Sequence, residues 1–140
     1  MLGTLIAKSK IRSGYNSLSQ HHIDEFIKPW ADDATFIYPG NLSVSGEYRG
    51  KQAIEAFFRK WVEQFPVSRF TIKHICVQNI FDMVGTNHIA VEWEVTLKNK
   101  NGKEHQNHGV MSIDLKMGKA ILVRDLMADM EAAKEGWGEV

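Results

Sequence analysis

The alternation of apolar and polar side chains between Gly102 and Asp129 constrains the fold of this chain most strongly. Strand side chains repeat every two residues, so the alternation predicts two β-strands joined by a turn at residues 117–119. One face of the first strand would carry His105, Asn107, Gly109, Met111, Ile113 and Leu115. One face of the second strand would carry Ile121, Val123, Asp125 and Met127. The pattern therefore predicts a hairpin whose apolar face contains a few polar groups.

Asp125 is the most informative of these polar groups, because burying a carboxylate among apolar side chains costs free energy. We predict that the hairpin directs Asp125, Asn107 and His105 into one apolar cavity that binds a small molecule. Structural alternatives exist for each residue. Asp125 could pair with an Arg at the rim of the fold, Asn107 could satisfy a buried neighbour, and His105 could be a surface residue near a turn.

The chain has 140 residues, which is enough for one domain with a core; we place this domain at residues 1–129 and expect a loose tail at residues 130–140. The 17 basic residues balance the 17 acidic ones, which argues against nucleic acid as the main partner, because phosphate binding needs a basic surface. The single Cys76 cannot form an internal disulfide, and no segment resembles a signal peptide or a membrane span. We therefore expect a cytoplasmic protein with no membrane partner.

Helical periodicity dominates the N-terminal half. It predicts helices at residues 2–18, from about 20 to 28, and at 51–65, and Pro29 should end or kink the second helix, whose apolar stripe reaches Trp30. Residues 40–50 have the composition of a loop. Strands are predicted at residues 34–38, at 69–80 with a bulge near 73–74, and at 87–98. This order predicts an α+β fold in which three N-terminal helices cover the hollow side of a curved, mostly antiparallel sheet.

Three segments together resemble nuclear transport factor 2-like domains. They are WADDATF at residues 30–36, GEYRGKQAIEAFF at 46–58 and GKAILVRDLMAD at 118–129. Within that superfamily the chain is most similar to SnoaL-like polyketide cyclases and to ketosteroid isomerases. The resemblance covers residues 12–129 and implies a cone-shaped barrel, a hydrophobic pocket and, often, a homodimer formed through the outer face of the sheet.

The resemblance does not favour a ketosteroid isomerase. Those enzymes place a general-base Asp where this chain has Tyr38, a first-helix Tyr where it has Gly14, and a neutral hydrogen-bonding Asp near Gly109. Tyr15 stands one place from the expected Tyr, and we predict that it faces elsewhere. The three main groups of the isomerase site are therefore missing at the matching positions.

The resemblance to SnoaL-like cyclases implies an Asp on the last strand as the acid/base group, with polar groups on the preceding strand. Asp125, Asn107 and His105 match that arrangement. We predict that Asp125 transfers the proton, and that Asn107 and Tyr38 orient or polarise a carbonyl oxygen. The predicted ligand-binding residues are Trp30, Phe58, Trp61, Trp93, Met111, Val123 and Met127. The three Trp residues among them could equally be core.

We predict neither a metal nor a cofactor. His21 and His22 are adjacent, and neighbouring positions on a helix diverge, so they do not form a metal pair. Two functions remain at this point. One is acid/base catalysis of cyclisation, isomerisation or dehydration on a small apolar carbonyl compound; the other is non-catalytic binding of a small hydrophobic ligand, or a role as a dimeric accessory domain.

Overall fold

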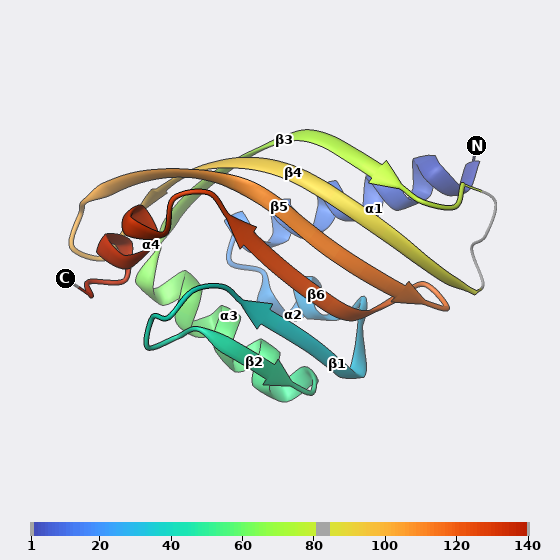
Figure 1. Cartoon of the computed structure of the whole chain (residues 1–140), viewed down its shortest axis with the longest axis horizontal. Coiled ribbons are helices and arrows are strands. Elements are labelled where there is room, and N and C mark those ends of the chain that lie inside the picture. The colour runs from blue at the N-terminus through green and yellow to red at the C-terminus, as the bar shows by residue number, and fades with distance from the viewer. Residues whose placement is uncertain (1, 81–84, 140) are drawn as a thin grey trace.

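The computed structural model describes residues 2–80 and 85–139 (Figure 1). In chain order the elements are α1 (Leu2–Ser19), α2 (Ile23–Ile27), β1 (Trp30–Tyr38), β2 (Gly46–Arg49), α3 (Lys51–Gln64), β3 (Val67–Val77), β4 (Thr86–Lys98), β5 (Glu104–Lys116), β6 (Lys119–Met127) and α4 (Met130–Gly136). The strands form one six-stranded sheet in the order β2-β1-β6-β5-β4-β3. Adjacent strands in this sheet run antiparallel, except β1 and β6, which run parallel. The predicted α+β class and the mostly antiparallel sheet are confirmed.

The sheet is strongly curved, and β3, β4 and β5 arch over α1, α2 and α3 (Figure 1). Helix α1 packs on β3, and α3 packs on β1 and β2. The bulge predicted near residues 73–74 is confirmed by a shift in the pairing of β3 with β4 between Ile72 and His74. An extra residue at this point bends the strand and increases its twist, which helps the sheet to curl. The sheet nevertheless stays open, with β2 and β3 at its edges, so it does not close into the cone-shaped barrel implied by the resemblance.

Three further predictions of local structure are corrected. Trp30 starts β1 instead of continuing the stripe of α2, because the helix ends at Ile27, before Pro29. The expected loop at residues 40–50 contains β2, which pairs with β1 between Thr35 and Tyr38. The expected strand at 69–80 begins earlier, at Val67, and ends at Val77.

The expected loose tail contains α4, so the described residues form four helices where three were predicted. The Asp129 side chain caps α4 by accepting a hydrogen bond from the Ala132 N–H over 2.9 Å. A helix of 7 residues has too few positions to display a helical period, and most of its stability comes from tertiary contacts.

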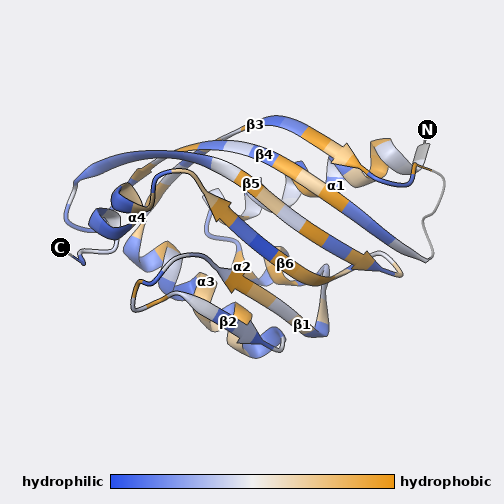
Figure 2. Ribbon diagram, in the orientation of Figure 1, coloured by the Kyte–Doolittle hydropathy of each residue, from blue (hydrophilic) through white to orange (hydrophobic). Residues whose placement is uncertain are grey.

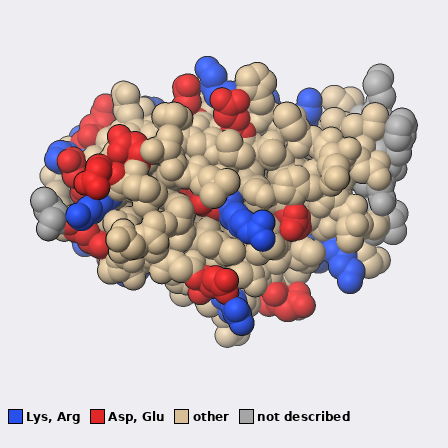
Figure 3. All heavy atoms as spheres, viewed as in Figure 1, with Lys and Arg blue, Asp and Glu red and all other residues tan. Residues whose placement is uncertain are grey.

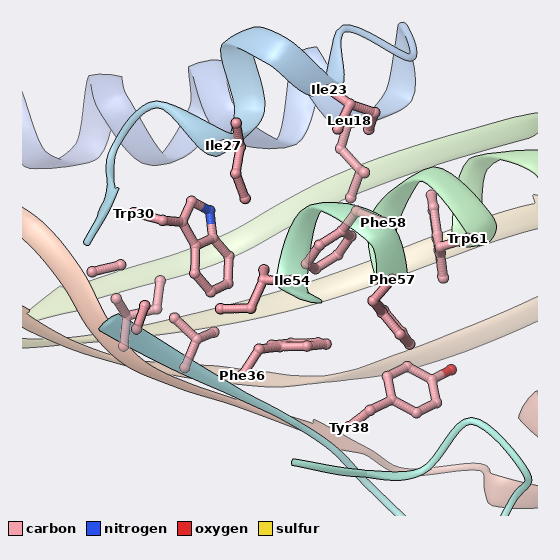
Figure 4. Close-up of a cluster of buried hydrophobic side chains, with 14 of the residues drawn as sticks. Leu18, Ile23, Ile27, Trp30, Phe36, Tyr38, Ile54, Phe57, Phe58 and Trp61 are labelled. Atoms are coloured by element: carbon pink, nitrogen blue, oxygen red, sulfur yellow. The ribbon is translucent and has the colours of Figure 1, made fainter. Parts of the chain in front are cut away.

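The core lies between α3 and the hollow side of the sheet, where Ile54 and Phe57 of α3 meet Phe36 and Tyr38 of β1 (Figure 4). The ring centroids of Phe36 and Phe57 lie 5.1 Å apart, and those of Tyr38 and Phe57 also lie 5.1 Å apart. Removing a buried aromatic ring of this kind costs roughly 3–5 kcal/mol of unfolding free energy. Bands of high and low hydropathy alternate along the long strands, as expected for strands with one buried face (Figure 2).

Charged side chains of both signs are mixed on the face drawn in Figure 3. This face carries no broad basic surface of the kind that phosphate binding needs. None of the helices in residues 2–80 and 85–139 combines the length and the apolar character that a membrane span requires.

Candidate functional site

A cavity of about 60 Å³ lies on the hollow side of the sheet, beside Asp125 of β6. Its walls come from the helices α1, α3 and α4 and from the strands β1 and β3–β6. Met111 of β5 pairs directly with Asp125 in the sheet, and both residues line the cavity. We call this space the first cavity. The alternation predicted for the final hairpin is therefore confirmed for Val123, Asp125 and Met127, and it directs Asp125 inward. The predicted place of Ile121 on the same face is wrong, because the pairing shifts between Asp114 and Leu115 and puts the buried Ala120 opposite Leu115.

Asp125 is buried, with 9% of its surface exposed. Burial raises the pKa of its carboxyl group from 3.8 to about 7, because the charged form loses its hydration. The backbone N–H of Leu126 and the indole of Trp93 act in the opposite direction and lower that pKa. Arg124 is exposed on the other face, and no cation in the described part of the chain forms an ion pair with Asp125. Asp125 thus has the environment of an acid/base group that titrates near neutral pH.

Several polar atoms around the first cavity lack a partner. Within the described residues, five buried side-chain polar atoms make no hydrogen bond, and four belong to residues of this cavity: Tyr15 OH, Trp93 Nε1, His105 Nε2 and Asp125 Oδ1. The Trp93 indole is near enough to favour the charged form of Asp125, although its N–H does not reach hydrogen-bond geometry. Buried polar atoms without a protein partner are uncommon. Their concentration here supplies donors and acceptors for a polar group of a ligand.

Tyr15 was expected to face elsewhere, and that expectation is wrong. Its side chain lines the first cavity, and its pKa is raised by burial and, to a smaller extent, by the charge of Asp125. Tyr15 lies four residues after Ile11 and three before Leu18, so the three share one face of α1. This helical spacing, rather than an alignment with the isomerase Tyr, is the signal that places Tyr15 in the site.

Tyr38 also lines the first cavity, at the end of β1. Its hydroxyl oxygen accepts a hydrogen bond of 2.9 Å from Trp137 Nε1, just after α4. Burial is the main cause that raises the pKa of Tyr38, so the phenol stays neutral and keeps its own O–H for donation. The hydrogen bond from Trp137 depends on α4, a helix that was not predicted from the sequence.

Asn107 and His105 are both buried and both line the first cavity. The Asn107 side chain donates to the Asp129 carbonyl oxygen over 2.8 Å and accepts from the Asp129 N–H over 3.1 Å. Its amide therefore holds the start of α4. This role is structural, although Asp129 is exposed and is not the buried neighbour that was expected. The Nε2 of His105 has no partner within the described residues, as noted above.

The predicted ligand-binding residues divide between two cavities. Phe58, Trp61, Trp93, Met111 and Met127 line the first cavity. Trp30 and Val123 do not; they line a second cavity of about 160 Å³, on the side of α1 and α2, which Phe58 and Met111 also line. The sequence pattern could not separate the two spaces, because residues of both share the same strand faces.

The sequence profile of the SnoaL-like domain matches residues 11–123. The chain belongs to the SnoaL-like domain family. The matched region ends two residues before Asp125, so membership in the family does not itself include the carboxylate. No match is found among the curated proteins.

Solved structures share the fold of this SnoaL-like domain. A Bacillus subtilis protein described as a candidate isomerase has 20% identity and a TM-score of 0.80, with 100% of this chain and 98% of that chain covered. A candidate SnoaL-like polyketide cyclase from Jannaschia sp. CCS1 has 15% identity and a TM-score of 0.66, with 82% and 78% covered. TerC co-crystallised with polyporic acid has 17% identity and a TM-score of 0.68, with 91% and 95% covered. At these identities the similarity establishes the fold, and the function has to be argued from the site.

Metal ligands do not gather in this SnoaL-like domain: among residues 2–80 and 85–139, no three His, Cys, Asp or Glu side chains are placed to hold one ion. His21 and His22 lie in the connection between α1 and α2, where His21 adopts a positive φ of 62°. The polar groups of the first cavity include one carboxyl, two phenols, an imidazole, an indole and the amides of Gln106 and Asn107, which suit proton transfer and hydrogen bonding.

Proposed function

We propose that this SnoaL-like domain is an enzyme that performs acid/base chemistry on a small apolar carbonyl compound, with Asp125 as the proton-transferring group. The reaction class is a cyclisation, an isomerisation or a dehydration. The observation that carries the proposal is the buried Asp125 carboxyl, which has a pKa of about 7 and no cation paired with it in the described residues. A general acid/base works best when its pKa lies near the working pH.

In the proposed step, the Asp125 carboxylate takes a proton from the carbon next to the carbonyl. The C–H electron pair moves into the new C=C bond, and the carbonyl oxygen becomes an enolate oxygen. The neutral carboxylic acid then returns the proton to a carbon or an oxygen of the same substrate. No net oxidation occurs, and no co-reactant is required.

Neutral donors would stabilise the enolate oxygen. The Tyr15 hydroxyl has no partner in the described structure. The Tyr38 oxygen accepts from Trp137, which leaves the Tyr38 O–H free to donate. Raised pKa values keep both phenols protonated. The unpaired Trp93 N–H is a third donor at the same cavity. Donors placed where charge develops commonly supply a large part of such catalysis. Asn107 would act indirectly, because its amide holds α4 against the cavity.

A non-catalytic binder of a small hydrophobic ligand is the alternative. The mostly apolar walls of both cavities favour it, as does the co-crystallisation of TerC, which has a similar fold, with polyporic acid. Binding alone would need neither a titrating carboxyl nor unpaired donors beside it.

Deuterium exchange distinguishes the two functions without knowledge of the natural substrate. Small ketones are incubated with the protein in D₂O, and deuterium incorporation next to the carbonyl is followed by NMR. We expect the wild-type protein to accelerate exchange, with a rate that rises as the pH passes through about 7. Asp125→Asn should reduce the enzymatic rate by roughly 10²–10⁴-fold while leaving ketone binding nearly intact.

Asp33→Asn is the matched control, because Asp33 is exposed and lies outside both cavities. It should leave the exchange rate unchanged. Tyr15→Phe should lower the rate without shifting its pH dependence. If ketones bind and Asp125→Asn exchanges them as fast as the wild-type protein, the catalytic assignment fails and the binding function replaces it.

A further inference from the structure

The second cavity is larger than the first, with a volume of about 160 Å³ against about 60 Å³. It lies between α1, the start of β1 and the inner faces of β4, β5 and β6. Most of its walls are aliphatic or aromatic, with Ile11 on one side and Ile89, Ile113 and Val123 on the other. An apolar cavity of roughly 150 Å³ is large enough to hold a benzene-sized molecule.

The two cavities meet at a shared partition. Tyr15, Leu18, Phe58 and Met111 line both spaces. Met111 is paired with Asp125 in the sheet and also lines the second cavity. The second cavity therefore begins one strand away from the Asp125 carboxylate. A Met side chain is unbranched and adapts its shape easily, so this part of the partition can move aside for a ligand.

The first cavity is too small for the whole of a substrate. A space of about 60 Å³ can hold little more than a carbonyl and its immediate neighbours, whereas small-molecule sites are usually larger. Four of the five buried polar atoms without partners in the described residues belong to the first cavity, and three of those residues, Trp93, His105 and Asp125, line it alone. The second cavity offers mainly apolar contacts. The polar groups thus gather around Asp125 in the first cavity, and the apolar walls extend from Met111 to Val123 in the second.

We propose that the two cavities form one elongated site, in which the second cavity binds the apolar end of the substrate, a phenyl ring or an alkyl chain of about six carbons. The carbonyl end of the same molecule lies in the first cavity beside Asp125. The assignment of the carbonyl end rests on the proposed function above. The assignment of the apolar end rests on the volume and the walls of the second cavity.

Gly14 offers a way to fill the second cavity without touching the first. It lies in α1, lines the second cavity only, and a Cβ added to it would meet no atom within 4 Å. Replacing a helical Gly also improves helix propensity, so the variants should fold. Gly14→Phe puts a ring into the cavity. Gly14→Ala is the matched control, because it also replaces the helical Gly with a better helix former but adds little volume.

The test compares binding of 2-butanone and 2-octanone by calorimetry. Each buried methylene raises affinity roughly fourfold, so 2-octanone should bind the wild-type protein at least about tenfold more tightly. Gly14→Ala should keep this ratio. Gly14→Phe should reduce it to about threefold or less while leaving the affinity for 2-butanone unchanged. Equal ratios in Gly14→Ala and Gly14→Phe would overturn the proposal.

Benzene provides a second measurement that depends on no variant and no reaction. In a methyl NMR titration, benzene should shift Ile89, Ile113 and Val123, which line only the second cavity. Binding elsewhere, or no binding at millimolar concentration, would contradict the proposal. The outcome is independent of catalysis: if benzene binds here and Asp125→Asn still exchanges ketone protons, the second cavity stands as a site and the proposed function fails alone.

Discussion

The side chain of Asn107 binds both backbone groups of Asp129, donating to the carbonyl oxygen over 2.8 Å and accepting from the N–H over 3.1 Å. Asp129 in turn caps α4 through its carboxylate. Residues Ala132, Ala133 and Gly136 of this helix line the first cavity. One buried amide on β5 therefore fixes the position at which α4 begins.

Asn107→Ala should loosen α4. Removing the amide leaves the Asp129 carbonyl and N–H without their partner, which should lower the free energy of unfolding by roughly 1–3 kcal/mol. Hydrogen exchange at the backbone amides of Ala132 to Trp137 should accelerate more than exchange in β4. His108→Ala is the control, because the exposed His108 side chain is absent from the amide's contacts. Unchanged protection of α4 in Asn107→Ala would contradict this role.

Asp125 should make stability depend on pH. The pKa of Asp125 is raised in the folded protein, so folding favours the neutral acid. This contribution to the free energy of unfolding is fully present below about pH 3.8 and is lost as the pH rises through about 7. This interval corresponds to roughly 4 kcal/mol. Asn cannot ionise, so Asp125→Asn should match the wild-type protein near pH 4 and exceed its unfolding free energy by up to that amount near pH 8.

Urea unfolding of both proteins across this pH range measures the difference. Asp33→Asn provides the baseline for removal of an exposed carboxyl. A constant difference between Asp125→Asn and the wild-type protein at all pH values would mean that the buried carboxyl does not titrate in this window.

Gly109→Ala should damage the sheet next to the site. Gly109 pairs with Trp93 on one side and Met127 on the other. A Cβ at this position would collide with the Leu126 carbonyl oxygen and lie 2.9 Å from the Trp93 ring. Overpacking of this kind costs roughly 1–3 kcal/mol, measurable by thermal unfolding. Gly14→Ala, which meets no neighbour, should be neutral or slightly stabilising, and equal effects of the two substitutions would contradict the steric argument.

We expect a homodimer formed through the outer face of the sheet. Val110 and Leu126 pair with each other there and are exposed, by 36% and 54%. A stable interface buries about 1,600 Å² in total. Leu126→Arg should convert the dimer into a monomer in light scattering at micromolar concentration, whereas Met117→Arg, in an exposed turn, should not. A monomeric mass for the wild-type protein would exclude this assembly.

The sequence by itself determined five of the six strands in the described sheet, the shared phase of Val123, Asp125 and Met127, and the inward direction of Asp125. Strand phase is a local property with a period of two residues, so Val123, Asp125 and Met127 had to share one face once the hairpin formed. The bulge in β3 was visible in the same way, as a change of phase near residue 73. The α+β class followed from the order of the helical and strand periods.

Only the tertiary structure decided which polar groups meet Asp125. Tyr15, Tyr38 and Trp93 come from three elements far apart in the chain, and nothing in their local sequences encodes the distances between them. Helix α4 escaped prediction because it is short and depends on bonds from Asn107 and Gln64, which exist only after the chain has folded. The division into two cavities depends on the packing of Tyr15, Phe58 and Met111 against one another, because residual volume is a property of side chains from several elements and has no period along the sequence.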